Sequence, residues 1–337
     1  MTDIAANPRL TNVPAPQGRR AHGLFSLDDL SDDTYHRLVR RSYELFSDPS
    51  DHRSPLSGAI VGTLFTKTST RTRTAFTTAV LRLGGHVISY GPNDLQLATG
   101  ESVADTGRVL GGMLDGLVAR TAGPMAQLRE LSRVGTLGVV NAMAVEEHPT
   151  QAICDVATLA LLAGPGRRLD GLRLLYVGEG NNTATALALA LARLPGSRTT
   201  FATPAGYGLP PGYLEAARRR GWTTGARVEE VHDLADVTGD FDVVYTTRWQ
   251  TTGTAKQDPH WREAFRPFHV DAALLRRWPS SVFMHDLPAH RGEEVESSVL
   301  DGPRSIAWTQ ARMKLSSAMA VMEWLFSSGD VLGETAE

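Results

Sequence analysis

The feature that most restricts the fold is a regular alternation of short apolar runs with longer helical patterns along the chain. Strands are predicted for the short runs of the first half, 59–65, 86–90, 116–119 and 138–141. Helices are predicted before and between them, over residues 27–45, 74–83, 102–114 and 125–133. Such alternation is typical of α/β folds, in which helices flank a mainly parallel sheet.

A second series of the same kind follows a turn-rich, charged stretch at 164–168 that suits a hinge. Its predicted elements are a strand at 172–177, a helix at 183–194, strands near 199–202, 243–245 and 282–285, and a last helix at 310–326. A length of 337 residues is comfortable for two domains. The expected parts are a leader at 1–22, a first domain at 23–163, a second domain at 164–308, and a C-terminal helix, 309–337, that packs back on the first domain.

Composition excludes several classes of protein. The net charge is -3, with 34 basic and 37 acidic residues, so we expect no nucleic-acid partner. No apolar run approaches the roughly 18 residues of a membrane helix, so no membrane partner is expected. Cys154 is the only cysteine and lies in an apolar run, which indicates core packing and fits a reducing cytoplasm. The leader lacks the apolar core of a signal peptide, so a cytoplasmic location is expected.

An anion site is predicted where the first strand meets the next helix. Residues 59–83 consist of an apolar strand, the polar loop TKTSTRTR and a helix. Free backbone N–H groups at a helix N-terminus favour an anion, and Ser69, Thr70 and Thr72 add hydroxyl donors. Arg71 adds a guanidinium that binds phosphate oxygens in pairs. Arg73 is either part of this clamp or a structural partner of a neighbouring acid, and a capped helix with a basic turn is the alternative interpretation.

Further motifs follow in a fixed order along the chain. They are Gly100-Glu101-Ser102 with Asp105-Thr106, Arg120-Thr121, Glu147-His148-Pro149-Thr150-Gln151, Asn181-Asn182, His285-Asp286-Leu287-Pro288 and His290-Arg291-Gly292-Glu293-Glu294-Val295. Together with Ser69–Arg73, they resemble the aspartate and ornithine carbamoyltransferase family, from about Leu27 to Leu325. The overall resemblance is greatest to the ornithine type. Six motifs in family order are a specific signal, whereas one alone would be weak.

The resemblance implies that an amine attacks carbamoyl phosphate and phosphate leaves, in a cleft between two domains that close over the substrates. No cofactor or metal is implied. The residues expected to hold carbamoyl phosphate are Ser69, Thr70, Arg71, Thr72, Gln96, Arg120, His148, Gln151, Leu287 (through its backbone carbonyl) and Lys314. Arg120 and His148 would polarise the carbonyl oxygen. In the family, the loop that matches the one carrying Gln96 reaches into the site of a neighbouring subunit, which implies a homotrimer with shared sites. An exposed loop residue is the alternative for Gln96.

The acceptor half departs from the ornithine type. Asn181 and Asn182 resemble that type, but its Asp-x-Trp…Ser-Met-Gly pattern is replaced here by Thr247-Arg248-Trp249-Gln250-Thr251-Thr252-Gly253. Thr247, Arg248 and Gln250 instead resemble the aspartate type, whose Arg and Gln hold acceptor carboxylates. Asp286 replaces a cysteine and is assigned to binding the acceptor ammonium or to accepting its proton. A buried carboxylate needs a cation, here the substrate ammonium or Arg248.

Two more positions depart from the family pattern. Lys314 stands where the ornithine type has an arginine, which keeps the charge but loses the paired donors. Thr99 stands where the aspartate type has a lysine. We therefore expect a carbamoyltransferase of specialised amino-acid metabolism whose acceptor is an amine other than ornithine, such as a shorter diamino acid.

Several alternatives stay open at this point. Ornithine fits if Asp286 replaces the lost aspartate, and the reverse reaction, phosphorolysis of a ureido compound, fits the same residues. A catalytically silent relative that binds carbamoyl phosphate, or serves as a subunit, is the rival from another class. Gly178-Glu179-Gly180 after a strand is a weak match to a dinucleotide site, because the third glycine is missing. The segment 290–294 is either a loop near the acceptor or a surface charge cluster.

Overall fold

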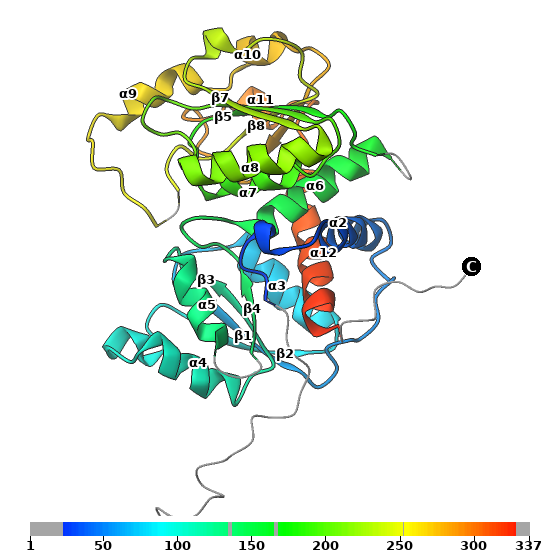
Figure 1. Cartoon of the computed structure of the whole chain (residues 1–337), viewed down its shortest axis with the longest axis vertical. Coiled ribbons are helices and arrows are strands. Elements are labelled where there is room, and N and C mark those ends of the chain that lie inside the picture. Colours follow the sequence, from blue (N-terminus) through cyan, green and yellow to red (C-terminus); the bar gives the residue numbers. More distant parts are fainter. Residues whose placement is uncertain (1–22, 134–136, 165–167, 252, 328–337) are drawn as a thin grey trace, which may run out of the picture.

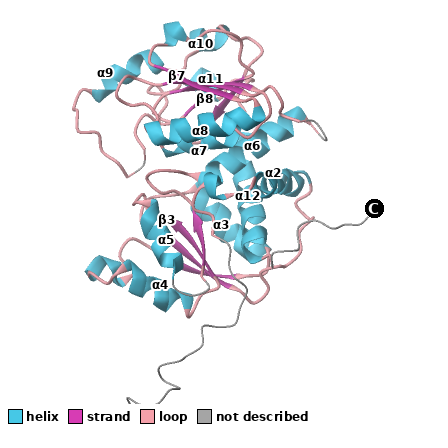
Figure 2. Ribbon diagram, viewed as in Figure 1, coloured by secondary structure: helices cyan, strands magenta, loops and turns pink. Residues whose placement is uncertain are grey.

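The computed structural model describes residues 23–133, 137–164, 168–251 and 253–327. The expected leader, most of the expected hinge at 164–168 and the last residues of the C-terminal segment lie outside these ranges. The described residues form two α/β units, which we call the first and second domains (Figures 1 and 2). None of the described helices is long and apolar enough to cross a membrane.

The first domain is built on a parallel sheet of order β2-β1-β3-β4. Its strands are β1 (Ile60–Phe65), β2 (His86–Tyr90), β3 (Gly116–Arg120) and β4 (Gly138–Asn141). Its helices are α2 (Asp32–Ser47), α3 (Arg71–Arg82), α4 (Val103–Gly111) and α5 (Met125–Arg133), with the short 3-10 helices η2 (Leu27–Asp29) and η3 (Gln96–Thr99). The strands β3 and β4 are buried throughout, as expected for strands covered on both faces.

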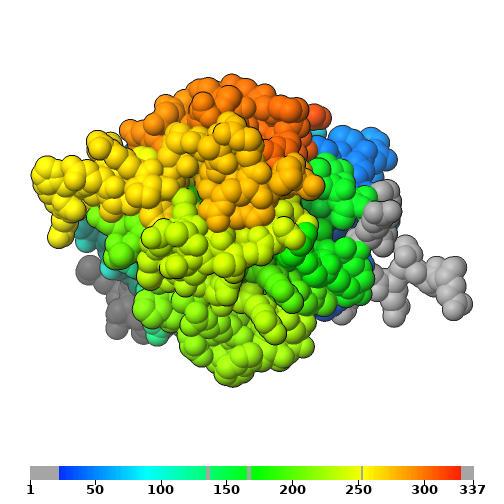
Figure 3. Space-filling view, turned by 90° about the horizontal axis from the view of Figure 1, so that it is seen from above, coloured from blue at the N-terminus to red at the C-terminus, as the bar shows by residue number. Residues whose placement is uncertain are grey.

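The second domain has a parallel sheet of order β7-β6-β5-β8-β9. Its strands are β5 (Arg173–Val177), β6 (Arg198–Ala202), β7 (Arg227–Val231), β8 (Val243–Thr246) and β9 (Val282–His285). Its helices are α7 (Asn182–Leu191), α8 (Pro211–Thr224), α9 (Trp261–Phe265), α10 (Ala272–Arg276) and α11 (Ser297–Leu300), with η4 (Leu234–Asp236) and η5 (Arg266–Phe268). The segment between β8 and α9 projects from one side of the molecule, in yellow in Figure 3.

Two helices lie where the domains meet. Helix α6 (Pro149–Ala163) leads from the first domain to the second, and α12 (Ala307–Phe326) packs against α2, α3 and α6 (Figure 1). The central part of α7 is apolar and wholly buried, so it forms a common core with α6. Helix α12 thus follows the last strand of the second sheet but contacts helices of the first domain.

The predicted fold class, two α/β domains with parallel sheets flanked by helices, is confirmed. One helix start was wrong in a way that concerns the site. Helix α3 begins at Arg71, three residues before the predicted start at 74, so Arg71 and Thr72 belong to its first turn. Four N-terminal amides of a helix lack an intrahelical acceptor, and this shift places those amides within the Ser69–Thr72 motif.

Candidate active site

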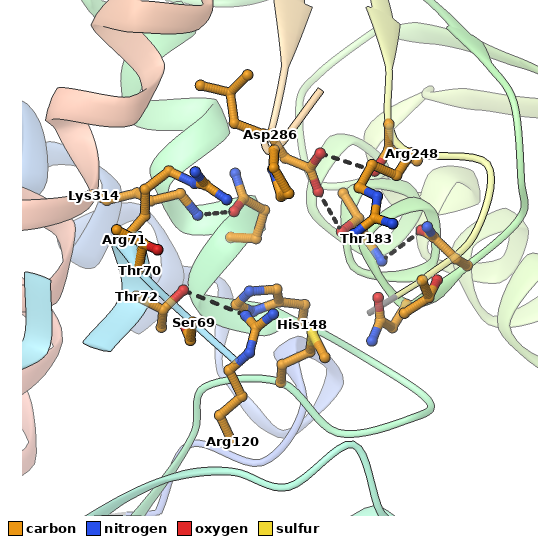
Figure 4. A pocket seen from close by; sticks show the side chains of 18 of the residues that line it. Ser69, Thr70, Arg71, Thr72, Arg120, His148, Thr183, Arg248, Asp286 and Lys314 are labelled. Carbon is orange, nitrogen blue, oxygen red and sulfur yellow. Dashed lines mark hydrogen bonds between the residues drawn. The ribbon is translucent and has the colours of Figure 1, made fainter. Parts of the chain in front are cut away.

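A cavity of about 180 Å³ lies where the two domains meet, and both contribute to its wall (Figure 4). The first domain and α6 supply the loop at the start of α3, the end of β3 and the start of α6. The second domain supplies the start of α7 and the ends of β8 and β9, while α12 adds one lysine. The lining residues are Thr68, Ser69, Thr70, Arg71, Thr72, Arg120, Met143, His148, Gln151, Asn181, Asn182, Thr183, Thr247, Arg248, Thr251, Asp286, Leu287, Pro288 and Lys314.

The start of α3 is arranged to bind an anion. Its N-cap, Thr70, makes no side-chain cap hydrogen bond, so the amides of the first turn are not satisfied by it. Ser69, Thr70 and Thr72 line the cavity beside these amides. Arg73 faces elsewhere: its Nη2 donates to the Phe65 carbonyl at 3.3 Å, and its guanidinium lies 5.0 Å from the Phe65 ring centre. Ser69–Thr72 therefore line the cavity, whereas Arg73 packs on β1 and forms no ion pair with an acid among the described residues.

Three cations on the donor side are partly deprived of water. Burial lowers the pKa of Arg120 to about 10, and it also lowers the pKa of Arg71 and of Lys314 below their ordinary values. Within the described part of the chain, the buried Nε atoms of Arg71 and Arg120 have no hydrogen-bond partner. Buried cations of this kind are stabilised by an anion, because the anion restores the interactions that water supplied.

His148 presents a neutral imidazole to the same half of the cavity. It is the N-cap of α6, and Pro149 occupies the first helical position, where proline is well tolerated. Burial, with the nearby charges of Lys314 and Arg120, holds the pKa of His148 well below its ordinary value. Its Nδ1 lies 3.3 Å from the Thr150 hydroxyl. A neutral ring that donates one N–H can polarise a carbonyl oxygen without adding a further positive charge.

Among the described residues, the acceptor half contains a single carboxylate, Asp286, at the end of β9. Its Oδ1 accepts a hydrogen bond from the Thr247 hydroxyl at 2.8 Å, and its Oδ2 accepts one from Thr183 at 3.0 Å. The Nδ1 atom of His285 lies 3.5 Å from Oδ1 of Asp286. That nitrogen accepts the Leu287 N–H at 2.8 Å, so the ring proton is on Nε2, toward Glu294 at 3.2 Å. The hydroxyl groups of Thr183 and Thr247 thus each donate to one oxygen of the Asp286 carboxylate.

The Asn181-Asn182 segment forms a packed turn at the start of α7. The Asn181 side chain caps the helix by accepting from the amides of Thr183 and Ala184, and Asn182 Nδ2 donates to the Ala144 carbonyl at 2.7 Å. A Cβ at position 180 would lie 2.2 Å from the carbonyl carbon of Gly208. Glycine is therefore needed at 180 for close chain packing, which accounts for the glycine-rich turn without a dinucleotide.

Several predicted residues lie outside the cavity. Gln250 turns away, with its Nε2 donating to the Thr254 carbonyl at 2.6 Å. Gln96 is exposed on η3 in the first domain, where Thr99 donates to its side-chain oxygen at 2.6 Å. In the segment 290–294, Glu294 is buried against His285, and Arg291 pairs with Asp301 on the surface. Cys154 is buried, and burial raises the pKa of its thiol to about 12.

Five lining residues were not among the site residues expected from the sequence: Thr68, Met143, Thr183, Thr251 and Pro288. Thr183 follows Asn181-Asn182 in the first turn of α7, so the start of that helix was an available signal. Thr251 lies within the replaced Ser-Met-Gly pattern. Met143 has φ of 147°, a backbone state that nothing in its sequence context indicates.

The cavity is chemically divided. Its described lining includes four cationic side chains, Arg71, Arg120, Arg248 and Lys314, and one carboxylate. Such a site favours a dianionic donor at the start of α3 and leaves a place for an ammonium group at Asp286. A cleft between two parallel-sheet domains with these properties suits an enzyme that binds a phosphorylated donor beside a second substrate.

Comparison with known proteins gives the family. Residues 22–160 match the model described as "Aspartate/ornithine carbamoyltransferase, carbamoyl-P binding domain", and residues 170–325 match its "Asp/Orn binding domain" counterpart. The chain belongs to the aspartate/ornithine carbamoyltransferase family and is a carbamoyltransferase of that family.

Individual relatives agree over most of the chain. An ornithine carbamoyltransferase of Gloeobacter violaceus is 37 % identical over 300 residues, which cover 89 % of this chain and 94 % of that protein. One from Acidothermus cellulolyticus is 40 % identical over 276 residues, covering 81 % and 87 %. The structure of ornithine carbamoyltransferase from Pyrococcus furiosus has a TM-score of 0.83 at 34 % identity, covering 90 % of this chain and 97 % of that one.

Proposed function

We propose that this carbamoyltransferase moves the carbamoyl group of carbamoyl phosphate to an amine of an amino-acid acceptor other than ornithine, giving a ureido product and phosphate. The observation that carries the proposal is the position of Asp286 between the hydroxyls of Thr183 and Thr247. This carboxylate is the only one among the described residues that line the cavity, so it is the group that binds the acceptor ammonium. Its side chain is 13 % exposed, so the interaction is shielded from water.

The donor half supports the first step of this reaction. The α3 N-terminus with Arg71 binds the phosphate, while Arg120 and His148 donate toward the carbonyl oxygen. The negative charge on that oxygen grows as the amine attacks, so preorganised donors stabilise the transition state more than the ground state. Leaving phosphate keeps its contacts with the cations that bound it, and the protein forms no covalent intermediate. Leu287, with φ of 54°, lies beside this half and offers its backbone carbonyl to the amide hydrogens.

The acceptor half supports recognition of an amino acid. Arg248 lines the cavity across from the donor cations and is the group assigned to the acceptor carboxylate. Asp286 is assigned to the ammonium group, and it accepts a proton from the attacking amine if that amine is the group nearest to it. The carboxylate therefore comes from the end of β9, whereas the ornithine type carries it at the position of Thr247.

A panel of acceptors tests the proposal. Phosphate release from carbamoyl phosphate is measured with ornithine, lysine, 2,4-diaminobutyrate, 2,3-diaminopropionate, aspartate and putrescine. We expect a diamino acid other than ornithine to give the highest kcat/KM. Turnover of ornithine far above every other amine would reject the altered acceptor and leave the carbamoyltransferase assignment unchanged.

Ornithine is the second candidate, and one observation favours it. The Asp286 carboxylate lies one hydrogen bond, 2.8 Å, from the Thr247 hydroxyl. A carboxylate is therefore retained at this end of the cavity although the residue at 247 has changed. The curated relatives described above are also named ornithine carbamoyltransferases.

We also propose that the active enzyme is a homotrimer in which Gln96 of one subunit reaches the site of the next. The exposure of Gln96 outside its own cavity supports this arrangement. Sedimentation gives the oligomeric state, and mixing inactive Gln96→Ala and Arg71→Ala subunits tests the sharing. Hybrid trimers in which one site is intact should regain activity, and mixtures that stay inactive would contradict shared sites.

A further inference from the structure

A buried carboxylate lies behind the cavity and is not part of its wall. Asp155 is on α6 and is wholly buried. Its Oδ1 accepts hydrogen bonds from Gln151 Nε2 and Gln310 Nε2, both at 2.7 Å, and its Oδ2 accepts one from the Tyr245 hydroxyl at 3.0 Å. Burial of a carboxylate is unfavourable unless donors satisfy it, and here three donors do so.

These contacts determine which end of the Gln151 carboxamide faces the cavity. Burial raises the pKa of Asp155 to about 7. Its Oδ1 nevertheless accepts from two amide groups and is therefore an acceptor whether or not the carboxyl holds a proton, so the amide nitrogen of Gln151 faces it. The Lys314 ammonium only donates, and it donates to Oε1 of Gln151 (Figure 4). Both partners require the same orientation, with the amide oxygen on the side of Lys314, which lines the cavity. An amide oxygen accepts two hydrogen bonds, so one place remains for an N–H of a bound carbamoyl group.

The same carboxylate is connected to the acceptor half. Tyr245 is on β8, two residues before Thr247. The side-chain oxygen of Gln310 accepts the backbone N–H of His285 at 3.0 Å, next to Asp286. The Gln310 amide also donates to the Tyr245 hydroxyl at 3.1 Å. Asp155 thus fixes α6 and α12 relative to the two strand ends that carry the acceptor residues.

We propose that Asp155 is a positioning residue that holds the Gln151 amide oxygen toward the donor half of the cavity. It sets the affinity for the carbamoyl end of the donor without touching it. This role rests on the proposed function, in which Gln151 contacts the carbamoyl group. The phosphate end is bound on another element, the start of α3, so loss of Asp155 leaves its binding unchanged.

Two small ligands separate the carbamoyl end from the phosphate end. Phosphonoacetamide carries a carbamoyl group on a phosphonate, and methylphosphonate lacks the carbamoyl group. Calorimetry gives the affinity of each for wild type and for Asp155→Leu. Leucine has nearly the same size and removes the acceptor of the Gln151 amide nitrogen, so the Gln151 amide oxygen is no longer held toward the cavity. We expect phosphonoacetamide to bind about 10-fold more weakly, the effect of one hydrogen bond, and methylphosphonate to change by less than about twofold.

Tyr245→Phe is the matched control. It removes a hydrogen bond to the same carboxylate but leaves the bond to Gln151, so both affinities should stay within about twofold of wild type. Asp155→Ala replaces Asp155→Leu if the latter does not fold, with the same expected selectivity. Equal weakening of both ligands, or no weakening of either, would overturn the positioning role.

The outcome is distinguishable from failure of the proposed function. Suppose that wild type carbamoylates an amine, and that the Asp155 variants still bind phosphonoacetamide better than methylphosphonate by the wild-type ratio. Then only the positioning role is wrong. If no amine is carbamoylated although the substitutions abolish that preference, the proposed function is wrong and the positioning role stands for donor binding alone.

Discussion

Asp286 is the single carboxylate among the described residues that line the cavity. Asp286→Asn keeps the size of that side chain and removes its charge. We expect KM for the acceptor to rise about 10- to 100-fold, because a charge-assisted hydrogen bond contributes roughly 1.5–3 kcal/mol. KM for carbamoyl phosphate should change little. Steady-state kinetics with each substrate varied in turn measures both. Asp301→Asn, which affects a surface pair with Arg291, is the control and should match wild type.

Glu147 gives a prediction about pH. It is buried next to His148, its Oε1 accepts the Leu27 N–H at 2.8 Å, and burial raises its pKa from 4.5 to about 7. Below pH 4.5 both the folded and the unfolded chain hold this proton. As pH rises toward 7, the unfolded chain releases it first, so the folded state loses stability. Above pH 7 both states release it and the loss stays constant. Between pH 5 and 8 the loss is about 2.5 kcal/mol.

Glu147→Gln keeps the acceptor for Leu27 and cannot titrate. Its free energy of unfolding relative to wild type should therefore increase by about 2.5 kcal/mol from pH 5 to pH 8. Urea unfolding at both pH values measures this difference. Glu130→Gln, a surface substitution, should follow wild type at both. A Glu147→Gln curve parallel to that of wild type would show that Glu147 is ionised in the folded protein.

Single residues differed in how far the sequence predicted them. The clamp residues, Arg120, His148, Gln151 and Asp286 lie in short motifs, and the structure brings them to one cavity. Thr183 and Met143 were missed because their roles depend on tertiary neighbours: Asp286 for the first and a positive φ for the second. For Gln250 the family pattern suggested an acceptor contact, whereas a local bond to Thr254 directs its side chain away.

Among the elements, the segment between β8 and α9 has an unusual anchor. Lys256 pairs with Glu179, and its ammonium lies 4.9, 5.3 and 5.1 Å from the ring centres of Tyr207, Trp261 and Phe265. Glu179 also accepts the Thr251 hydroxyl at 3.2 Å, and Thr251 lines the cavity. The ion pair and aromatic contacts therefore hold this segment against the acceptor half.

Lys256→Met keeps the apolar stem among the rings and removes the charge. We expect KM for the acceptor to rise about 10-fold, because the partly buried Glu179 loses its cation and the segment carrying Thr251 loosens. Donor KM should stay the same. Arg262→Met is the control, since Arg262 also lies over Trp261, at 4.4 Å, but is half exposed. Equal kinetic effects of the two substitutions would count against the anchor.

Element prediction located the strands of the first sheet and failed at the β7 edge of the second sheet. Strand β7 and helix α8 were not predicted. The sequence of β7, Arg227 to Val231, contains two glutamates because it is an edge strand with one neighbour. Helix α8 contains three consecutive arginines and buries only two residues, so its apolar periodicity is weak. Amphipathic patterns report burial, and these elements have little of it.

At the scale of the whole molecule, one buried arginine connects the domains. Arg193 follows α7 in the second domain, and its Nη2 donates to the carbonyls of Leu27 at 2.6 Å and Leu30 at 3.1 Å in the first. Its Nη1 pairs with Asp32, and the guanidinium lies 5.1 Å from the Tyr35 ring centre. The sequence alone suggested no such role, because an arginine at a helix end is also a common partner of the helix dipole.

Arg193→Met should therefore destabilise the protein as a unit. It removes three hydrogen bonds to the first domain and leaves buried acceptors there without a donor, which costs about 3 kcal/mol. For a protein of this size the midpoint of thermal unfolding should fall by about 4 °C. Calorimetry should also show the single transition broaden or split, since the domains are less firmly coupled.

Arg220→Met is the control: Arg220 binds the same Asp32, but its side chain is 25 % exposed, and such pairs contribute at most about 1 kcal/mol. If both variants melted at the same temperature, the interface would depend on its apolar contacts and not on Arg193.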